Sequence, residues 1–276
     1  MPERRTHHVT TTDGVTIGGS VHGQGPPLVF LQGVIGDGDL DWGPTVEHLA
    51  DRFTCHLVSL RGRGPSDDHP DLSLSRLVED VVEYVDSLGD RAGLTGWSGG
   101  GSWALAAASR CASVSAVAPF EPGMLHLLGP DDQALLGSAV TRTGELVAAG
   151  DGAAAARAFG AFPFTEQEAV EVAATGYFES AGRYAPHLMS VLQQAMASAD
   201  PTSDPAVLGA IDVPAAVLVG SQTKPFFAAS ADYVSEHVPN ARVHRVPGAA
   251  HAAPITHPQA LAEALAEFFA ATPQPV

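Results

Sequence analysis

Gly96-Trp97-Ser98-Gly99-Gly100 has the form Gly-x-Ser-x-Gly and stands between a predicted strand at 92–95 and a predicted alanine-rich helix at 102–111. The glycines two positions before and after the serine lack the Cβ atoms that would clash in a tight strand-to-helix turn. Such a turn projects the Ser98 hydroxyl from the carboxyl edge of a sheet, where the first amides of the helix favour an oxyanion. The stretch therefore predicts a nucleophilic serine; a glycine-rich turn without a chemical role is the alternative.

Strand and helix patterns alternate on both sides of this turn. A hairpin is expected over 6–23 around Asp13-Gly14. Strands are then predicted at 28–31, 55–60 and 114–119, and helices at 42–52 and 74–88. The first two of these strands are continuous apolar runs, which are typical of strands buried on both faces of a parallel sheet. Because strand and helix alternate, the sequence predicts an α/β protein with a mostly parallel, doubly wound sheet.

The alternation stops between residues 122 and 212, where the sequence is helical in character. Helices are predicted at 135–149, 153–159, 169–178 and 187–196. Thr165 and Glu168 form the capping-box pattern of a helix start. Beyond this segment the alternation resumes, with strands at 215–220 and 241–246 and helices at 226–238 and from Pro258 onward. We therefore expect a core of residues 1–121 and 213–276, with residues 122–212 inserted as a helical lid, or cap.

The chain of 276 residues is acidic, with 31 Asp and Glu against 14 Lys and Arg and a net charge of −17. Such a surface repels phosphate backbones and anionic lipids, so we expect neither a nucleic acid nor a membrane as partner. The N-terminal residues contain no apolar signal region, and no window approaches about 18 consecutive apolar residues. The two cysteines, Cys55 and Cys111, lie in apolar segments and are too few for a disulfide framework. These features favour a cytoplasmic protein.

The sequence predicts no metal and no other cofactor. Spacings of the type His-Glu-x-x-His or paired Cys-x-x-Cys are absent from it. Asp37-Gly-Asp39-Leu-Asp41 resembles the start of an EF-hand loop, but Trp42 stands where that loop needs glycine and His48 where it needs glutamate. We interpret this run as a solvated loop at the entrance of the site. Lys224, the only lysine, does not follow a glycine, which excludes a Walker A phosphate loop.

A serine nucleophile requires a base within hydrogen-bond reach. Of the twelve histidines, His251 is the best placed, because it follows the last predicted strand and so lies in a loop at the same carboxyl edge as Ser98. The others fall on the hairpin, within helices and strands, in the cap or in less suitable loops. His126 lies in the cap, where it would be able to touch a substrate.

The chain resembles the α/β-hydrolase superfamily over about residues 15–271. The resemblance is carried by the strand order, the serine turn, the turn that begins Arg61-Gly-Arg-Gly, the helical insertion and the late Gly248-Ala-Ala-His251. It implies an α/β-hydrolase fold with an inserted helical lid. It also implies two oxyanion donors, the amide of Gly99 and the amide of Val34 in the loop after the strand at 28–31. Gln32 stands two positions before Val34, where the family usually has histidine.

The carboxylate that orients the base is not at its usual position. In the family it commonly follows the strand at 215–220, but here that loop reads Gly220-Ser-Gln-Thr223, and threonine cannot ionise. Glu121 follows the strand after the serine helix and would emerge beside Ser98, a position that some members of the family use. The alternatives are that Glu121 only caps its strand or the entrance to the cap, or that Asp232 supplies the acid from within a helix.

These residues predict a serine hydrolase that cleaves a carboxylic ester, lactone or thioester of an apolar small molecule through an acyl-enzyme. Ser98 attacks, His251 transfers the proton and Glu121 holds the imidazolium. The expected substrate contacts are Gln32, Trp97, Phe120, His126 and Phe226. Two alternatives remain: a C–C bond-cleaving or non-hydrolytic enzyme of a biosynthetic pathway, and a ligand-binding protein that has lost turnover, which Thr223 and Gln32 keep open.

Overall fold

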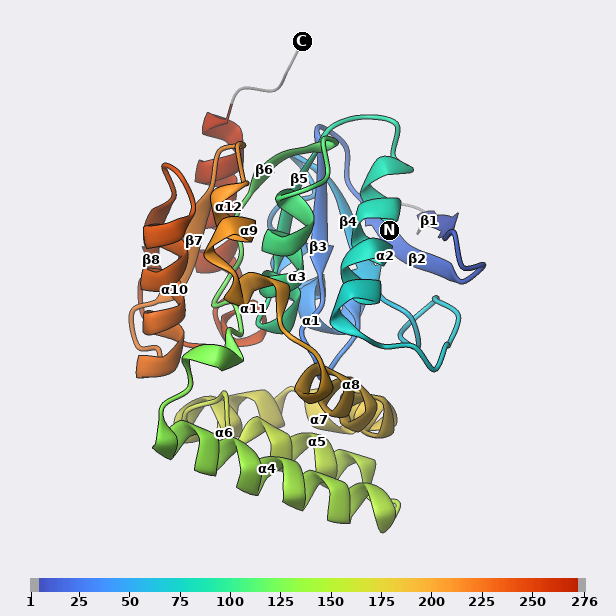
Figure 1. Cartoon of the computed structure of the whole chain (residues 1–276), viewed down its shortest axis with the longest axis vertical. Helices are drawn as coiled ribbons and strands as arrows, with labels where there is room; N and C mark the ends of the chain where they lie inside the picture. The colour runs from blue at the N-terminus through green and yellow to red at the C-terminus, as the bar shows by residue number, and fades with distance from the viewer. Residues whose placement is uncertain (1–4, 273–276) are drawn as a thin grey trace.

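In the computed structural model, which describes residues 5–272, a central sheet forms one part of the molecule and a group of helices lies against it (Figure 1). Residues 1–4 and 273–276, at the outer limits of the predicted core, lie outside the described residues. Within 5–272 no helix has both the length and the apolar character needed to span a membrane. The strands are β1 (Arg5–Thr10), β2 (Thr16–His22), β3 (Pro27–Leu31), β4 (Thr54–Ser59), β5 (Ala92–Gly96), β6 (Val114–Val117), β7 (Ala216–Gly220) and β8 (Arg242–Val246). The helices of the core are α1 (Gly38–Val46), α2 (Leu74–Asp86), α3 (Gly99–Ala108), α10 (Pro225–His237), α11 (Ala253–Thr256) and α12 (Pro258–Ala271).

The strands are ordered β1-β2-β4-β3-β5-β6, and β7 and β8 form a further pair. The β1–β2 and β2–β4 pairs are antiparallel, and the other pairs are parallel. Isolated bridges from Val117 to Ala215 and from Phe120 to Leu218 join β6 to the strand pair that follows. The predicted mostly parallel α/β sheet is thereby confirmed, and the predicted hairpin is the β1–β2 pair.

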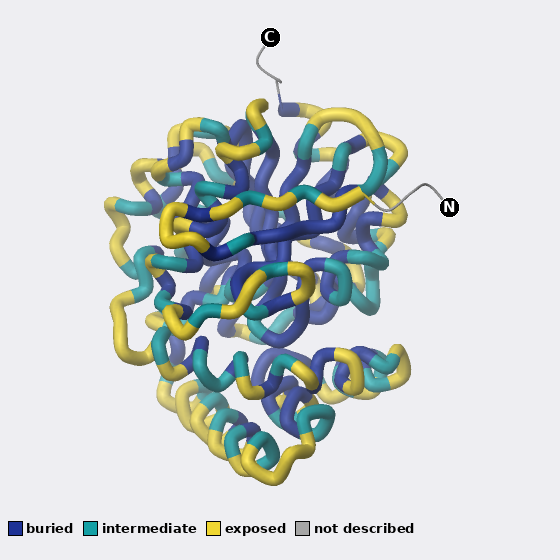
Figure 2. The backbone as a smooth tube through the Cα atoms, turned by 90° about the vertical axis from the view of Figure 1, so that its right-hand side faces the viewer, coloured by how far each residue is buried: buried dark blue, intermediate teal, exposed yellow. Residues whose placement is uncertain are grey.

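The sheet is buried on both faces, as the continuous apolar runs predicted. In β3, Leu28 and Phe30 pack in one apolar cluster with α1 and α12, whereas Val29 and Leu31 pack in another with α2, α3 and α10. Figure 2 shows the strands as a buried centre inside a more exposed outer layer. With both faces covered, the loops at the carboxyl ends of the parallel strands are the places for functional side chains.

The cap lies against the core as a separate group of helices (Figure 1). This group contains α4 (Pro130–Ala148), α5 (Gly152–Gly160), α6 (Glu166–Ala174), α7 (Tyr177–Ala181) and α8 (Ala185–Ala197), with the 3₁₀ turn η2 (Gly182–Tyr184). The predicted cap range also includes η1 (Leu125–Leu127), η3 (Pro201–Ser203) and α9 (Pro205–Gly209), but η3 and α9 pack against α3 and α10 of the core. The predicted capping box of Thr165 and Glu168 is present at the start of α6. The single helix predicted over 169–178 is wrong, because Gly176 adopts a φ of +76° and separates α6 from α7.

The helix predicted over 42–52 is also wrong in its limits. It begins four residues earlier, because the Asp37 side chain accepts a hydrogen bond from the Leu40 amide at 2.9 Å and caps the first turn of α1. It ends at Val46, and residues 47–52 form turns.

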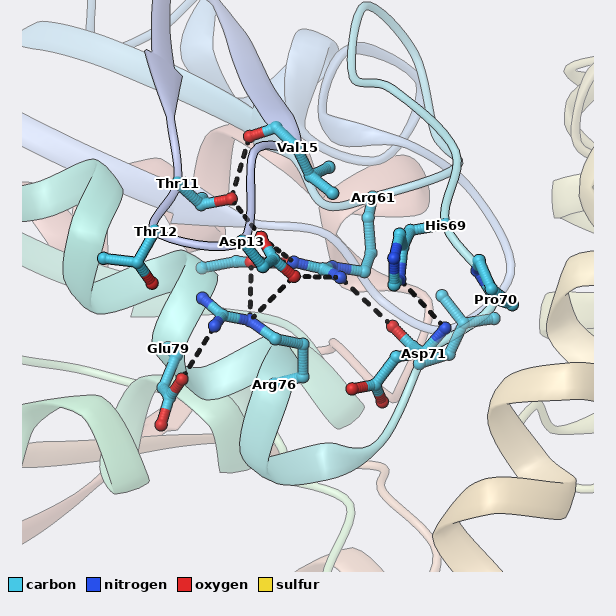
Figure 3. Close-up of polar contacts among 12 residues, drawn as sticks. Thr11, Thr12, Asp13, Val15, Arg61, His69, Pro70, Asp71, Arg76 and Glu79 are labelled. Atoms are coloured by element: carbon cyan, nitrogen blue, oxygen red, sulfur yellow. Dashed lines mark hydrogen bonds and ion pairs between the residues drawn. The ribbon is translucent and has the colours of Figure 1, made fainter.

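Arg61, in the turn after β4, ties the hairpin to α2. Its guanidinium is buried and pairs with Asp80 of α2 at 2.6 Å and with Asp13 of the β1–β2 turn at 3.0 Å. Figure 3 shows Arg61 and Arg76 directed at Asp13, and Arg61 also donates to the backbone oxygen of Asp71 at 3.3 Å. The bond from Arg61 lowers the pKa of Asp13, whereas burial raises the pKa of Asp80. This arginine therefore serves the fold of the core.

Candidate active site

Ser98 occupies the turn between β5 and α3 in a strained backbone conformation. Its φ of +57° lies in the left-handed region, which residues with a side chain rarely adopt. A Cβ atom on Gly96 would lie 2.2 Å from the Gly100 oxygen, and one on Gly100 would lie 2.2 Å from the Gln32 oxygen. Close backbone packing therefore requires both glycines. Because α3 begins at Gly99, the Gly99 amide lies next to Ser98, whereas the amides of Gly100 and Gly101 donate to the backbone oxygens of Trp97 and Ser98.

His251 and Glu121 form a buried pair. Nδ1 of His251 lies 2.8 Å from Oε2 of Glu121, and the side chains are 2% and 0% exposed. The other carboxylate oxygen of Glu121 accepts a hydrogen bond from the Gly220 amide at 2.8 Å. Glu121 has a positive φ of +44° where the chain leaves β6 for the cap. A carboxylate in this position favours the imidazole tautomer that carries its proton on Nδ1.

Neither of the other two positions considered for the acid forms a hydrogen bond with His251 among residues 5–272. Asp232 is an exposed residue of α10. Thr223, at the usual position of the acid, has a buried Oγ1 that finds no hydrogen-bond partner among residues 5–272. Of the three residues, Glu121 is the one that contacts His251.

Ser98 and His251 line the same small cavity, together with Val34, Trp97 and Tyr177. Among residues 5–272 no hydrogen bond joins the hydroxyl to the imidazole, although both residues line this cavity. Phe227 of α10 stacks on the imidazole, with ring centroids 3.8 Å apart and an interplanar angle of 11°. This contact, which fixes the plane of the imidazole, was missed by sequence analysis.

The two predicted oxyanion donors are neighbours across the cavity. A Cβ atom on Gly99 would lie 2.6 Å from Cγ1 of Val34, so the serine turn and the loop after β3 are in close contact. Gly123 also lies next to these groups, because a Cβ atom on it would lie 3.4 Å from the Gly99 nitrogen and 3.6 Å from Oγ of Ser98. Gly123 was not predicted, because nothing in its local sequence pattern distinguishes it from a loop glycine.

The run from Asp37 to Asp41 is not the solvated loop that the sequence suggested; that interpretation is wrong. Asp37 and Asp41 are 3% and 0% exposed. Asp41 accepts hydrogen bonds from the Gly33 amide at 2.7 Å and from the Tyr177 hydroxyl at 2.8 Å. Burial raises the pKa of Asp41 to about 7, although the bond from Tyr177 opposes the shift. Asp37 and Asp41 are buried because their carboxylates satisfy backbone and hydroxyl donors, and Asp41 does so at the oxyanion loop, residues 32–36.

Arg63 supports the oxyanion loop from its other side. The guanidinium is buried and donates to the backbone oxygens of Val34 at 2.8 Å, Ile35 at 2.8 Å and Gly36 at 2.6 Å. Burial lowers the pKa of Arg63 to about 10. The loop that carries the predicted donor is thus held by two buried side chains, the carboxyl group of Asp41 and the guanidinium of Arg63.

A second cavity adjoins Ser98 and extends between core and cap. Its lining is mainly apolar and includes Val34, Trp103, Leu125, Leu136, Phe159, Phe162, Val191, Leu192, Phe226 and Phe227, with Ser102 and Asp200 as polar members. Its free space is about 80 Å³. Such a lining suits an apolar substrate group next to the serine. A larger cavity of about 890 Å³ lies beside β7, β8 and α12 and contains none of the predicted site residues.

The predicted substrate contacts divide into two groups. Phe226 and Trp97 each line one of the two cavities next to Ser98. The structure does not bring the other three to these linings. Gln32 accepts a hydrogen bond from the Leu60 amide at 3.2 Å, Phe120 is buried in the core, and His126 packs edge-on against Tyr233 at 5.0 Å.

Residues 26–258 match a family described as the alpha/beta hydrolase fold. A pimeloyl-[acyl-carrier protein] methyl ester esterase from Stenotrophomonas maltophilia is 41% identical over 98 residues, and the chain spans 36% of that relative's length in the match. A protein of the same name from Xanthomonas campestris pv. campestris is 29% identical over 261 residues, which cover 92% of this chain and 98% of that one.

Solved structures share the fold. An alpha/beta hydrolase from Sphaerobacter thermophilus is 26% identical, with a TM-score of 0.73 over 95% of this chain and 100% of that chain. An enol-lactonase from Burkholderia xenovorans is 21% identical, with a TM-score of 0.76 over 96% and 100% of the two chains. The latter likeness concerns the fold alone.

Proposed function

The chain belongs to the α/β-hydrolase family, and on this premise we propose that it is a serine hydrolase that cleaves a carboxylic ester or lactone of a small apolar compound. The single observation that carries the proposal is the buried His251–Glu121 pair, whose imidazole faces the same cavity as Ser98. A strained serine at a helix start, beside a histidine oriented by a carboxylate, is suited to acyl transfer.

Ser98 Oγ attacks the carbonyl carbon of the ester, and its proton passes to Nε2 of His251. Glu121 holds the Nδ1 proton and stabilises the imidazolium that results. The imidazolium then gives its proton to the departing alkoxide, which leaves as the alcohol, and the acyl group stays on Ser98. Water, deprotonated by His251, attacks the acyl-enzyme. The bond between the acyl carbon and Ser98 Oγ then breaks, and the imidazolium returns its proton to Oγ, so that one ester and one water yield one acid and one alcohol.

The amides of Gly99 and Val34 receive the negative charge that forms on the carbonyl oxygen. Their loops are in contact, and the buried Asp41 and Arg63 hold the Val34 loop. Donors fixed before the reaction stabilise the transition state without reorganisation, which is the largest catalytic contribution in many enzymes of this type.

The apolar lining near Ser98 supports a substrate with an apolar acyl or alcohol group. The esterase names of the Stenotrophomonas and Xanthomonas relatives support an ester bond as the target. Residues 122–212, the cap, contain eleven Asp and Glu against three Arg and no Lys. Even without the buried Glu168, these acidic residues leave the cap with a net negative charge, which disfavours a substrate carried on an acidic protein and so favours a free small molecule.

Covalent labelling tests the proposal. Wild-type protein treated with a fluorophosphonate should gain one probe by intact mass and lose activity, whereas Ser98→Ala should remain unlabelled. Ser109→Ala, at the other end of α3, should behave like the wild type. Hydrolysis is then measured with p-nitrophenyl esters of increasing chain length, a panel of lactones and an acyl thioester. Absence of labelling together with binding of apolar ligands would overturn the enzyme assignment in favour of a ligand-binding protein.

A further inference from the structure

Two side chains of the cap, Tyr177 and Glu168, reach the two core loops that flank Ser98. We propose that they are positioning residues, so that the docked cap completes the active site and does not merely cover it. Tyr177 acts on the oxyanion loop through Asp41, and Glu168 acts on the loop that carries His251. The inference rests on the proposed function, since it concerns the geometry of the same reaction.

The first connection begins at Tyr177, the first residue of α7. Its side chain is 2% exposed, and its ring lines the cavity that contains Ser98. The hydroxyl donates to Oδ1 of Asp41 at 2.8 Å, and Oδ2 of the same carboxylate accepts the Gly33 amide at 2.7 Å. One buried carboxylate therefore joins a cap hydroxyl to the backbone just before the predicted donor.

The Val34 N–H belongs to the peptide between Gly33 and Val34, and both sides of that peptide are held. The Gly33 nitrogen binds Asp41, and the Val34 oxygen accepts a hydrogen bond from Arg63 at 2.8 Å. A Cβ atom on Gly36 would lie 1.9 Å from Oδ1 of Asp41, so the carboxylate fills the inside of the loop. The direction of the Val34 N–H thus depends on where Asp41 sits.

The second connection runs from Glu168 to the histidine loop. Glu168 is 4% exposed, and its Oε2 accepts the Thr165 amide at 2.9 Å in the capping box of α6. Its Oε1 accepts the amide of Ala252 at 2.5 Å. Ala252 follows His251 directly, so the carboxylate that starts a cap helix also holds the backbone next to the proposed base.

These two contacts make the position of the cap a determinant of catalysis. If the cap moves away, Asp41 loses a hydroxyl donor and the Ala252 amide loses its acceptor, and an unpaired buried group is costly. The transition state, which needs the oxyanion donors in place, is affected more than ground-state binding.

Tyr177→Phe tests the first connection, because it removes only the hydroxyl. Tyr84→Phe is the matched control, because Tyr84 of α2 is also buried. Its hydroxyl lies 3.2 Å from Nδ1 of His56 and belongs neither to the cap nor to the candidate site. We expect Tyr177→Phe to lower kcat by about three- to tenfold, the effect of one lost hydrogen bond, with KM unchanged. Tyr84→Phe should leave both constants at wild-type values.

An inhibitor that forms an oxyanion separates positioning from packing. A trifluoromethyl ketone adds to the serine hydroxyl and places its oxygen in the oxyanion hole, whereas the matching secondary alcohol does not. In Tyr177→Phe the affinity for the ketone should fall by the same factor as kcat/KM, and the affinity for the alcohol should stay constant. Equal losses for ketone and alcohol, or no loss for either, would overturn the role of Tyr177.

Glu168→Ala and Glu168→Gln test the second connection. Glutamine keeps an oxygen that can accept the Ala252 amide, so it should recover most of the kcat lost in the alanine variant. Glu171→Ala, one turn along α6, where Glu171 accepts a hydrogen bond from the Gln167 side chain at 2.8 Å, is the control. Equal losses in the Glu168 variants would contradict a role through the Ala252 amide.

The ketone experiment also separates this inference from the proposed function. If the wild type forms no ketone adduct and Ser98→Ala retains activity, the proposed function fails. If the wild type forms the adduct and Tyr177→Phe and Glu168→Ala match it in kcat and ketone affinity, only the positioning role of the cap fails.

Discussion

Nδ1 of His251 lies 2.8 Å from Oε2 of Glu121, although the two residues are 130 positions apart in the chain. The contact forms because β6 and the last strand pair end at the same edge of the sheet, and Glu121 also binds the Gly220 amide at the end of β7. One carboxylate thus reaches both the histidine and the loop where the family usually carries its acid. In the proposed mechanism the acid therefore stands after β6, one strand away from its usual place after β7.

Glu121→Gln should lower kcat by about 10⁴-fold with little change in KM, as happens when the orienting acid of a triad becomes an amide. The amide can donate to Nδ1 and so favours the wrong imidazole tautomer. Initial rates on the best p-nitrophenyl ester measure the effect. A variant with wild-type kcat would remove Glu121 from the mechanism.

Thr223→Val is the matching substitution to Glu121→Gln at the position where the family usually carries its acid. It removes a buried hydroxyl without a partner in the described chain and keeps the shape of the side chain. We expect the free energy of unfolding to rise by about 1 kcal/mol, because the desolvation cost of the hydroxyl disappears. Urea denaturation measures the change, and kcat should stay at the wild-type value. A loss of kcat would indicate that Thr223 takes part in the site.

Sequence patterns predicted part of the candidate site and missed other parts of it for a physical reason. Ser98 and His251 follow from short-range features, a motif and the end of a strand. The expectation for Glu121 combines strand adjacency with the resemblance to the family, which implies where the acid usually lies. Asp41 and Tyr177 were missed because their contact joins residues 136 positions apart, and the local pattern around Asp41 is that of a solvated acidic loop.

Gly123→Ala should place a methyl group against both the proposed nucleophile and a proposed oxyanion donor. Gly123 does not adopt a left-handed φ, so alanine is compatible with its backbone. The new Cβ would lie 3.4 Å from the Gly99 nitrogen and 3.6 Å from Ser98 Oγ, in the space that the oxyanion needs. We expect kcat to fall by about 10²- to 10³-fold, the effect of losing one oxyanion donor.

Gly137→Ala provides the control for that substitution. Gly137 lies within α4, and a Cβ atom there would meet nothing within 4 Å. The variant should keep wild-type kcat and gain up to about 1 kcal/mol of stability from the higher helix propensity of alanine. If Gly123→Ala were as active as Gly137→Ala, the Gly99 amide would not be an oxyanion donor.

Asp41→Asn should change how stability depends on pH. Burial raises the pKa of Asp41 from its ordinary 3.8 to about 7, with Asp37 raising it further and Tyr177, Gly33 and Arg63 opposing. Between these values the folded state keeps a proton that the unfolded chain releases, so stability from this group falls as pH rises from about 4 to about 7. The free energy of unfolding therefore falls through this group by at most about 1.4 kcal/mol per pH unit.

The asparagine variant lacks this proton, so its stability relative to the wild type should increase across the same pH range. Urea denaturation at several pH values between about 4 and 8 measures the difference. Asp232→Asn changes a carboxylate on the exposed side of α10 and controls for the substitution itself. A difference between Asp41→Asn and wild type that is constant with pH would contradict a raised pKa at this carboxyl.

Lys224→Met should loosen the cap. Lys224 follows β7 in the core, and its ammonium donates a hydrogen bond to the backbone oxygen of Phe162 in the cap at 2.6 Å. Partial burial lowers its pKa, so water does not fully replace this partner. Methionine keeps most of the apolar stem but removes the charged donor. Because the ammonium is half-buried, we expect the free energy needed to open the cap to fall by about 1 kcal/mol, which is at the low end for hydrogen bonds to charged groups.

Hydrogen exchange distinguishes a local opening from a general loss of stability. In Lys224→Met the amides of α6 and of the segment before it should exchange about fivefold faster, because opening of the cap costs about 1 kcal/mol less, while those of β3 and β5 keep their protection. Arg142→Met, which removes an exposed ion pair with Glu145 within α4, should leave both regions unchanged. A contact that only tethers the cap affects only the opening of the segment that it holds. If Lys224→Met raised exchange equally in the strands and in the cap, the contact would instead stabilise the whole fold.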